Sequence, residues 1–300
     1  MIKKMLKFED VSEGGERVTH LCKNDVYYAH LSIYNFALNV CKGKTVLDAG
    51  SGAGYGSAFL AEHGAKFVHA FDIEKKAVLF SRQNFTRPNL NYQVMGIEKI
   101  TGFAPKSLDV IFSSNALEHV PNVYPFFRSA WQLLRPDGIL IIAVPPVIDE
   151  ISRTDNINNA YHLNIWTPLQ WYHVLNQYFE KIQPYIHYYN KPGTVLDFNN
   201  TPDQTSVNET DFTFIPVPLD ELFHQPTLTV VFTAQNPRPE NLIPPPTDHV
   251  TFIDDSFTRP AKKADSIGLW IKKSQEIQRQ EGFLALWQRG KAFLIRRIRR

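Results

Sequence analysis

The chain has 300 residues, of which 43% are hydrophobic and 21% charged, so it is long and apolar enough for one substantial globular domain with appendages. Its formal net charge of +2 argues against nucleic-acid or membrane binding by the molecule as a whole. Cys22 and Cys41 are far apart, which predicts no metal site and no disulfide framework. The N-terminus lacks the apolar core of a signal peptide, so we expect a cytoplasmic protein.

From residue 44 onward, short apolar runs alternate with helix-like stretches, which is typical of βαβ units and a parallel sheet. Seven strands are expected, over residues 45–48, 67–72, 91–95, 108–113, 139–144, 182–189 and 227–234. Helices are expected over 25–40, after 54, after 73, near 121 and near 167. The predicted fold class is therefore α/β, with a mostly parallel sheet and helices on both faces.

The chain is expected to divide into three parts. Residues 1–238 form the main domain, and 190–226, rich in Asn, Thr, Pro and Asp, form an insertion or lid. Residues 239–264 form a Pro-rich linker, and 265–300 a basic helical tail.

A glycine-rich loop follows the first expected strand, with Asp48 before glycines at 50, 52, 54 and 56. The GxGxxG spacing of dinucleotide-binding loops fails in both registers, because Tyr55 and Ser57 stand where the third glycine is needed. A carboxylate at this place suits an ammonium group better than a pyrophosphate. Asp72 ends the next strand, where a carboxylate can accept hydrogen bonds from a ribose diol.

Four segments in this order resemble the motifs of class I S-adenosylmethionine-dependent methyltransferases. They are Asp48–Gly54 (DAGSGAG), Asp72–Ile73, Asp109–Val120 (DVIFSSNALEHV) and Leu134–Ile142 (LRPDGILII). The resemblance covers roughly residues 10–234 and implies a Rossmann-like seven-stranded fold and S-adenosylmethionine as the cofactor.

By the same resemblance, the cofactor-binding residues are Asp48, Gly50, Ser51, Gly52, Gly54, Asp72, Ile73, Ile97, Glu98 and Asn115. Asp48 and the loop backbone would hold the methionine moiety, and Asp72 the ribose hydroxyls. Ile73 would lie against adenine, and Asn115 would line the methyl-transfer site. The chain departs from the family at Gly96, where an Asp usually accepts from the adenine amino group; Ile97 and Glu98 are the expected substitutes.

Methyl transfer needs a base only when the acceptor is a poor nucleophile such as a hydroxyl. His119 and His162 are the candidate catalytic bases, since one follows the fourth strand and the other lies in the segment after the fifth. The alternative is that both histidines are structural and anchor their loops. A softer resemblance, resting on the helix at 25–40, Gly54–Gly56 and Tyr161–Leu163, is to bacterial methyltransferases of surface-polysaccharide assembly, which implies a glycosyltransferase partner.

The tail carries nine cations against two acidic residues over 271–300, and Phe283, Trp287, Leu294 and Ile298 share one helical face. Such a helix suits an anionic membrane surface, here the inner face of the cytoplasmic membrane. The alternative is docking on its own domain or a subunit. RNA binding is disfavoured, because the aromatic side chains do not interleave with the cations.

These observations favour O-methylation of a sugar or lipid-linked glycan by in-line methyl transfer. Two alternatives stay open: a methyltransferase of a small lipophilic acceptor such as a quinone precursor, and a non-catalytic membrane-docked module with a decayed methyltransferase fold.

Overall fold

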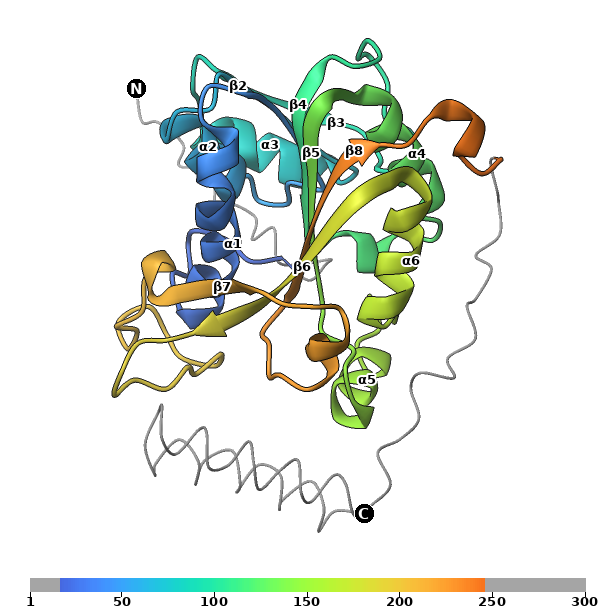
Figure 1. Cartoon of the computed structure of the whole chain (residues 1–300). Coiled ribbons are helices and arrows are strands. Elements are labelled where there is room, and N and C mark those ends of the chain that lie inside the picture. Colours follow the sequence, from blue (N-terminus) through green and yellow to red (C-terminus); the bar gives the residue numbers. More distant parts are fainter. Residues whose placement is uncertain (1–16, 246–300) are drawn as a thin grey trace, which may run out of the picture.

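The computed structural model describes residues 17–245, and Figure 1 shows their arrangement. The strands within this range are β1 Thr45–Ala49, β2 Phe67–Asp72, β3 Leu90–Val94, β4 Leu108–Ser114, β5 Leu134–Val144, β6 Phe179–Tyr189, β7 Phe212–Pro216 and β8 Val230–Pro237. The α-helices are α1 Asp25–Cys41, α2 Tyr55–Glu62, α3 Lys75–Asn84, α4 Tyr124–Leu133, α5 Glu150–Ile157 and α6 Pro168–Tyr178. Short 3₁₀ helices are η1 Leu117–His119, η2 Glu209–Asp211, η3 Asp220–Phe223 and η4 Glu240–Leu242.

The strands form one sheet in the order β3-β2-β1-β4-β5-β8-β6-β7. β1 to β5 pair in parallel, whereas β8 runs antiparallel between β5 and β6, and β7 runs antiparallel on β6. The predicted α/β class is confirmed, and all seven expected strands are present. The additional strand β7 lies in the segment expected to be an insertion or lid, because its five residues are too few to stand out from a turn-rich composition.

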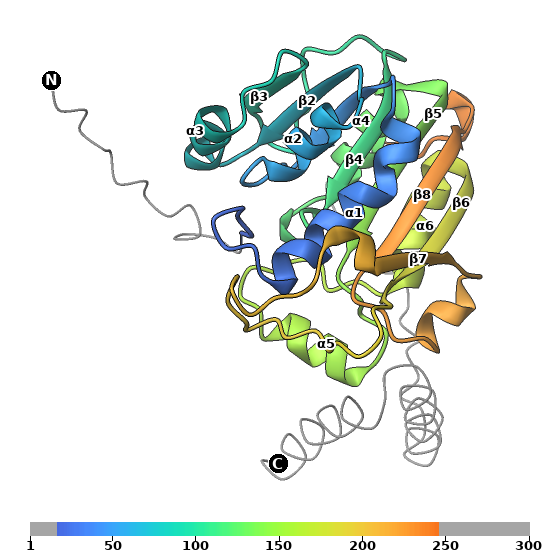
Figure 2. The ribbon, with the colours of Figure 1, turned by 90° about the vertical axis from the view of Figure 1, so that its left-hand side faces the viewer.

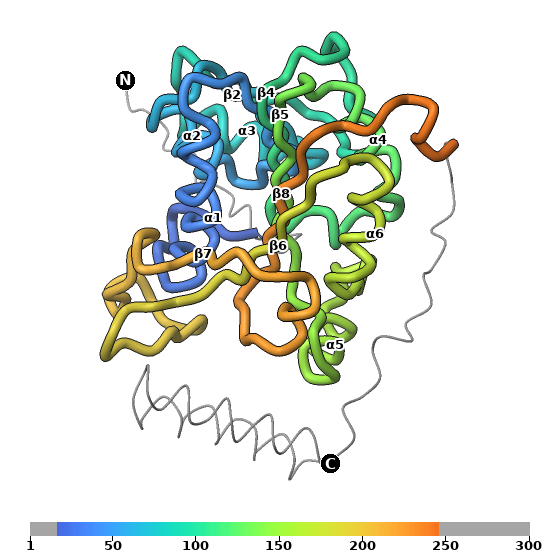
Figure 3. Tube along the Cα trace, in the orientation of Figure 1, coloured from blue at the N-terminus to red at the C-terminus, as the bar shows by residue number. Residues whose placement is uncertain are grey.

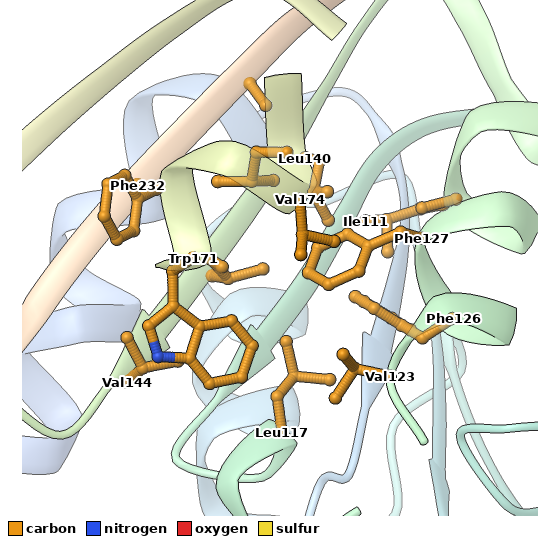
Figure 4. Close-up of a cluster of buried hydrophobic side chains, with 14 of the residues drawn as sticks. Ile111, Leu117, Val123, Phe126, Phe127, Leu140, Val144, Trp171, Val174 and Phe232 are labelled. Carbon is orange, nitrogen blue, oxygen red and sulfur yellow. The ribbon is translucent and has the colours of Figure 1, made fainter. Parts of the chain in front are cut away.

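Helices cover both faces of the sheet, as expected (Figures 1 and 2). α1 and α2 pack on one face, where Ile33, Ala37 and Leu60 contact apolar residues of β1, β4 and β5. α4 and α6 pack on the other face, and Figure 4 shows part of this larger cluster. Its labelled members are Ile111, Leu117, Val123, Phe126, Phe127, Leu140, Val144, Trp171, Val174 and Phe232.

The helix starts follow local sequence signals. In α6, the helix expected near 167, Thr167 caps the N-terminus in a reciprocal box with Gln170, and Pro168 occupies the first helical position. α5 was not expected; Asp149 caps it by accepting a hydrogen bond from the Ser152 N–H at 2.8 Å.

The parallel strands all end at one edge of the sheet, which brings together the loops after β1, β2, β3 and β4. The segment between β6 and η2 lies beside the N-terminal end of α1 (Figure 3). Asp25 fastens this contact, since its carboxylate accepts from the Asp197 N–H at 2.9 Å and from the Asn200 side-chain amide at 2.8 Å. The expected lid is therefore attached to the first helix.

At the other end of the described chain, residues beyond β8 still contact the domain. Trp131 Nε1 donates to the Arg238 carbonyl at 2.8 Å, and Arg128 donates to the Pro244 carbonyl. The predicted amphipathic helix at 265–300 and most of the predicted linker lie outside the described residues. Within 17–245, no helix combines the length and apolarity needed to cross a membrane.

Candidate functional site

The glycine loop joins β1 to α2 and is fastened to the end of β2. The N–H groups of Gly50 and Ser51 both donate to the Phe71 carbonyl, at 2.9 and 2.8 Å. Gly54 has a φ of +82°, and a Cβ there would lie 2.4 Å from the Ser81 hydroxyl oxygen, so only glycine fits. At Gly52, by contrast, the Cβ position has no described atom within 4 Å, which leaves room for a ligand to approach the backbone.

Asp48 lies fully buried beneath this loop. Its Oδ2 accepts hydrogen bonds from the Ser57 hydroxyl at 2.5 Å and from the Tyr34 hydroxyl at 3.4 Å. Its Oδ1 is buried without a hydrogen-bond partner among the described residues. Burial raises the pKa of Asp48 from 3.8 to about 7, opposed by the two hydrogen bonds and reinforced by nearby Asp72. A cation placed at Oδ1 would relieve the cost of this buried carboxylate.

Tyr34 of α1 reaches Asp48 because Gly56 leaves space for its ring. A Cβ at position 56 would lie 2.1 Å from the ring carbon Cζ of Tyr34. Tyr34 lies on the helix expected over 25–40, and its contact with Asp48 was not predicted from the sequence. No local signal could have shown it, since it depends on how α1 crosses the sheet.

Asp72 ties the end of β2 to the glycine loop. Its Oδ2 accepts from the Gly52 N–H and its Oδ1 from the Glu74 N–H, both at 2.9 Å. The guanidinium of Arg17 lies 3.5 Å from Oδ1, a contact that the sequence analysis missed. The next residue, Ile73, is 74% exposed, which is unusual for so large an apolar side chain.

The loop after β3 continues this surface. Ile73 Cδ1 lies 3.6 Å from the position that a Cβ at Gly96 would occupy, so Gly96 and Ile73 are neighbours. Ile97 is buried against Gly50, and Glu98 Oε1 accepts from the Asn122 N–H at 3.2 Å. The roles predicted for Ile97 and Glu98 in adenine recognition stay predictions.

Asn115 follows β4 in a left-handed conformation, with a φ of +47°, and its N–H donates to the Ala143 carbonyl at 2.9 Å. Ala116 then abuts the glycine loop, since a Cβ at Gly50 would lie 2.6 Å from its own Cβ. The chain turns here into η1, so η1 begins directly beside the loop.

His119 and His162 lie 43 residues apart in sequence, but their ring centroids are 5.1 Å apart. His119 Nδ1 lies 2.9 Å from the Tyr161 carbonyl oxygen. His162 is held between Asn156 Oδ1 at 2.7 Å from Nδ1 and the Asn159 side-chain amide at 3.0 Å from Nε2. The structure therefore brings together the two histidines that the sequence analysis selected separately.

Asn164 holds the two histidine-bearing segments against each other. Its side-chain amide donates to the carbonyls of Leu117 at 2.8 Å and Val120 at 2.6 Å. The N–H groups of Leu163 and Asn164 donate to the Glu118 carbonyl at 2.7 and 2.9 Å. Sequence reasoning also missed Asn164, because its partners are more than 40 residues away.

Comparison with known proteins agrees with this geometry. Residues 47–142 match the family model described as a methyltransferase domain. These residues therefore match a methyltransferase domain, and the ordered motifs of the sequence imply S-adenosylmethionine as its cofactor.

The methyltransferase domain has curated relatives in several bacteria. It is 30% identical over 105 residues to a ubiquinone biosynthesis O-methyltransferase of Neisseria meningitidis, and 35% identical over 104 residues to one of Coxiella burnetii. Each match covers 34% of this chain and 44% of the relative, so the chain spans less than half the length of either. Among solved structures, an S-adenosylmethionine-dependent methyltransferase of Thermotoga maritima is 12% identical with a TM-score of 0.53, covering 71% of this chain and 91% of that one, which shows the shared fold.

The described residues fit this cofactor at three points. The buried Oδ1 of Asp48 can accept from an ammonium group, and the space beside Gly52 admits a ligand against the loop backbone. The exposed Ile73 offers an apolar surface to a base. Asp48, Gly52, Asp72 and Ile73 therefore lie at the ends of β1 and β2 or in the loops that follow them, and their cofactor roles stay predictions.

Proposed function

We propose that this chain transfers a methyl group from S-adenosylmethionine to a hydroxyl oxygen of a small lipophilic acceptor. The observation that carries the proposal is the surface around the paired histidines. Four large apolar side chains flank His162 in sequence and are about half exposed: Ile151, Ile157, Tyr161 and Leu163. An exposed apolar group beside polar, titratable side chains is typical of a site for an amphipathic ligand. The relatives named as ubiquinone biosynthesis O-methyltransferases support this choice.

The bound cofactor supplies an electrophilic methyl group on a sulfonium. In our proposal Asp48 holds its ammonium group, Asp72 accepts from the ribose hydroxyls, and Ile73 packs against adenine. Asn115 and η1 shape the acceptor side, where His119 and His162 meet the acceptor hydroxyl. Alignment of acceptor and methyl group is the chief contribution, and can lower the barrier by about 7–11 kcal/mol.

Titration calorimetry with S-adenosylmethionine tests the cofactor part. Asp72→Ala should weaken binding at least tenfold, because it removes both the ribose acceptor and the anchor of the Gly52 N–H. Ile73→Ala should weaken binding about tenfold without lowering thermal stability, since Ile73 is exposed. Leu79→Ala, an exposed apolar residue of α3, is the matched control. Wild-type affinity in both Asp72→Ala and Ile73→Ala would reject the assignment.

The acceptor class is tested with labelled S-adenosylmethionine and separated lipid, glycan, RNA and protein fractions of a bacterial extract. We expect label in the lipid fraction, and a raised KM for that acceptor in Leu163→Ser. Label in RNA or protein alone would overturn the proposal. Full cofactor binding with no labelled fraction would instead favour the non-catalytic module.

A glycan hydroxyl is a second candidate acceptor, favoured by a polar cavity of about 260 Å³ at the N-terminal end of α1. Its lining includes Asp25, Asp197, Asn200 and Gln204, the donor and acceptor types that bind sugar hydroxyls. Label in the glycan fraction, lost in Gln204→Ala, would select it. This second candidate also includes the predicted association with a glycosyltransferase. It includes as well the predicted binding of the tail to an anionic membrane.

A further inference from the structure

We propose that Glu118, His119 and His162 bind one divalent transition-metal ion beside the methyl-transfer site. A second part of the proposal, which rests on the proposed function, is that this ion ligates the acceptor hydroxyl. One candidate ligand atom from each of the three side chains lies within 4.8 Å of the other two. No metal site was expected from the two distant cysteines, and His162 lies 43 residues from His119 and 44 from Glu118, which forms no recognisable ligand spacing.

The hydrogen bonds of the two imidazoles orient them as metal ligands. A ring nitrogen next to a carbonyl oxygen must carry the proton, so Nδ1 of His119 donates to the Tyr161 carbonyl. By the same reasoning Nδ1 of His162 donates to Asn156 Oδ1. In both rings Nε2 then carries the lone pair. A histidine that donates its other N–H to a carbonyl is the usual arrangement around bound metals.

Glu118 supplies the anionic ligand. Only 2% of its side chain is exposed, and its Oε1 lies 3.9 Å from Nε2 of His119. A carboxylate oxygen beside two imidazole nitrogens makes up a ligand set that divalent transition-metal ions accept.

The backbone around the three ligands is tightly held. The Glu118 carbonyl accepts from two N–H groups of the His162 segment, and Asn164 bridges Leu117 and Val120 on either side of Glu118. Rigid support of this kind is what a metal site needs, because the ligands must keep their geometry without the ion.

Two imidazoles and one carboxylate favour zinc, manganese or ferrous iron over magnesium or calcium, which prefer oxygen ligands. A tetrahedral ion with ligand distances of about 2.0–2.2 Å holds its ligands about 3.4 Å apart, so separations of up to 4.8 Å close with side-chain movements of about 1 Å. His162 Nε2 must exchange its contact with the Asn159 amide for the ion. Three protein ligands leave at least one position open for the acceptor oxygen.

The place of the cluster suits activation of a hydroxyl. Ala116 contacts Gly50 of the cofactor loop, and Glu118 follows two residues later. A divalent ion lowers the pKa of a bound hydroxyl, whose proton passes to water. The oxygen lone pair then forms the new bond to the methyl carbon while the carbon–sulfur bond breaks, and its electron pair stays on sulfur, giving S-adenosylhomocysteine.

The test is zinc titration of the chelator-treated full chain by calorimetry, in a Cys22→Ser background because that exposed thiol can itself bind zinc. We expect one equivalent of Zn²⁺, with affinity reduced at least tenfold in each of Glu118→Gln, His119→Ala and His162→Ala. His173→Ala, an exposed histidine of α6, is the control and should bind as the background does. Thermal unfolding of each variant shows that it is folded. Background affinity in His119→Ala and His162→Ala would overturn the site.

Activity tests the second part. Chelation should reduce methyl transfer to the acceptor at least tenfold, and added Zn²⁺, Mn²⁺ or Fe²⁺ should restore it. The affinity for S-adenosylmethionine should stay unchanged. Full activity after complete metal removal would overturn ligation of the acceptor and leave the histidines as bases. A failure of the proposed function can be distinguished from a failure of the metal site. The first would appear as absent cofactor binding or absent methyl transfer, whereas the zinc titration depends on neither.

Discussion

The two sides of the site are assembled in different ways. On the cofactor side, formed by β1, β2, β3 and the loops after them, each functional group lies within a few residues of a strand end. On the acceptor side, η1 meets residues 156–164, and α1 meets the segment after β6, through contacts between residues more than 40 positions apart. The functional groups of the cofactor side therefore lie on turns next to strand ends, whereas those of the acceptor side are brought together by long-range packing.

The largest expected effect concerns Asp48, the one buried carboxylate of the cofactor side described with an unpartnered oxygen. Burial raises its pKa to about 7, so the unfolded carboxyl ionises first, and the apo protein loses stability as pH rises from about 4 to about 7. The loss should be about 4 kcal/mol. Denaturant unfolding at several pH values should show this slope in wild type and a flat profile in Asp48→Asn.

Exposed Asp137→Asn should keep the wild-type slope. If Asp48→Asn also kept the wild-type slope, the ionisation of Asp48 would not be the source of the pH dependence of stability. S-adenosylmethionine should bind more tightly at pH 8 than at pH 6, since its ammonium group prefers the ionised carboxylate, and calorimetry would measure the difference.

A second comparison lies within the glycine loop. Gly54→Ala should lower the free energy of unfolding by about 3 kcal/mol, because the new methyl group overlaps Ser81 and the backbone has a positive φ. Gly52→Ala has a positive φ but open space, so it should cost only about 1 kcal/mol of stability while weakening cofactor binding. Thermal unfolding and calorimetry separate the two effects. Equal destabilisation would show that strain rather than overlap governs this loop.

On the acceptor side, Asn164→Ala should lower stability by about 2 kcal/mol, since it removes the side-chain amide that donates to the carbonyls of Leu117 and Val120. It should raise the KM of the acceptor and leave S-adenosylmethionine affinity unchanged. Asn91→Ala, on an exposed position of β3, is the control. A loss of cofactor affinity in Asn164→Ala would mean that the two sides are not independent.

The same difference explains how much could be predicted from the sequence. The strands, the glycine loop, Asp72 and the capping of α6 by Thr167 follow from patterns of a few neighbouring residues. The contacts of Tyr34 with Asp48 and of Arg17 with Asp72 do not, because they depend on where separate segments cross. For the same reason His119 and His162 were selected individually, while their proximity and the clamp by Asn164 were not foreseen.

The pairing of β8 with β5 extends the domain beyond the segment that matches the family model. The matched segment, 47–142, ends within β5, whereas six residues of β5 pair with β8, nearly a hundred residues later. α1, which precedes the match, and α6, which follows it, cover opposite faces of the same sheet. Cut out alone, the matched segment would keep α2 and α4 but would leave one edge of β5 unpaired and would lose α1 and α6, one helix from each face. The segment shared with the family model is thus smaller than the sheet and helix layers that it belongs to.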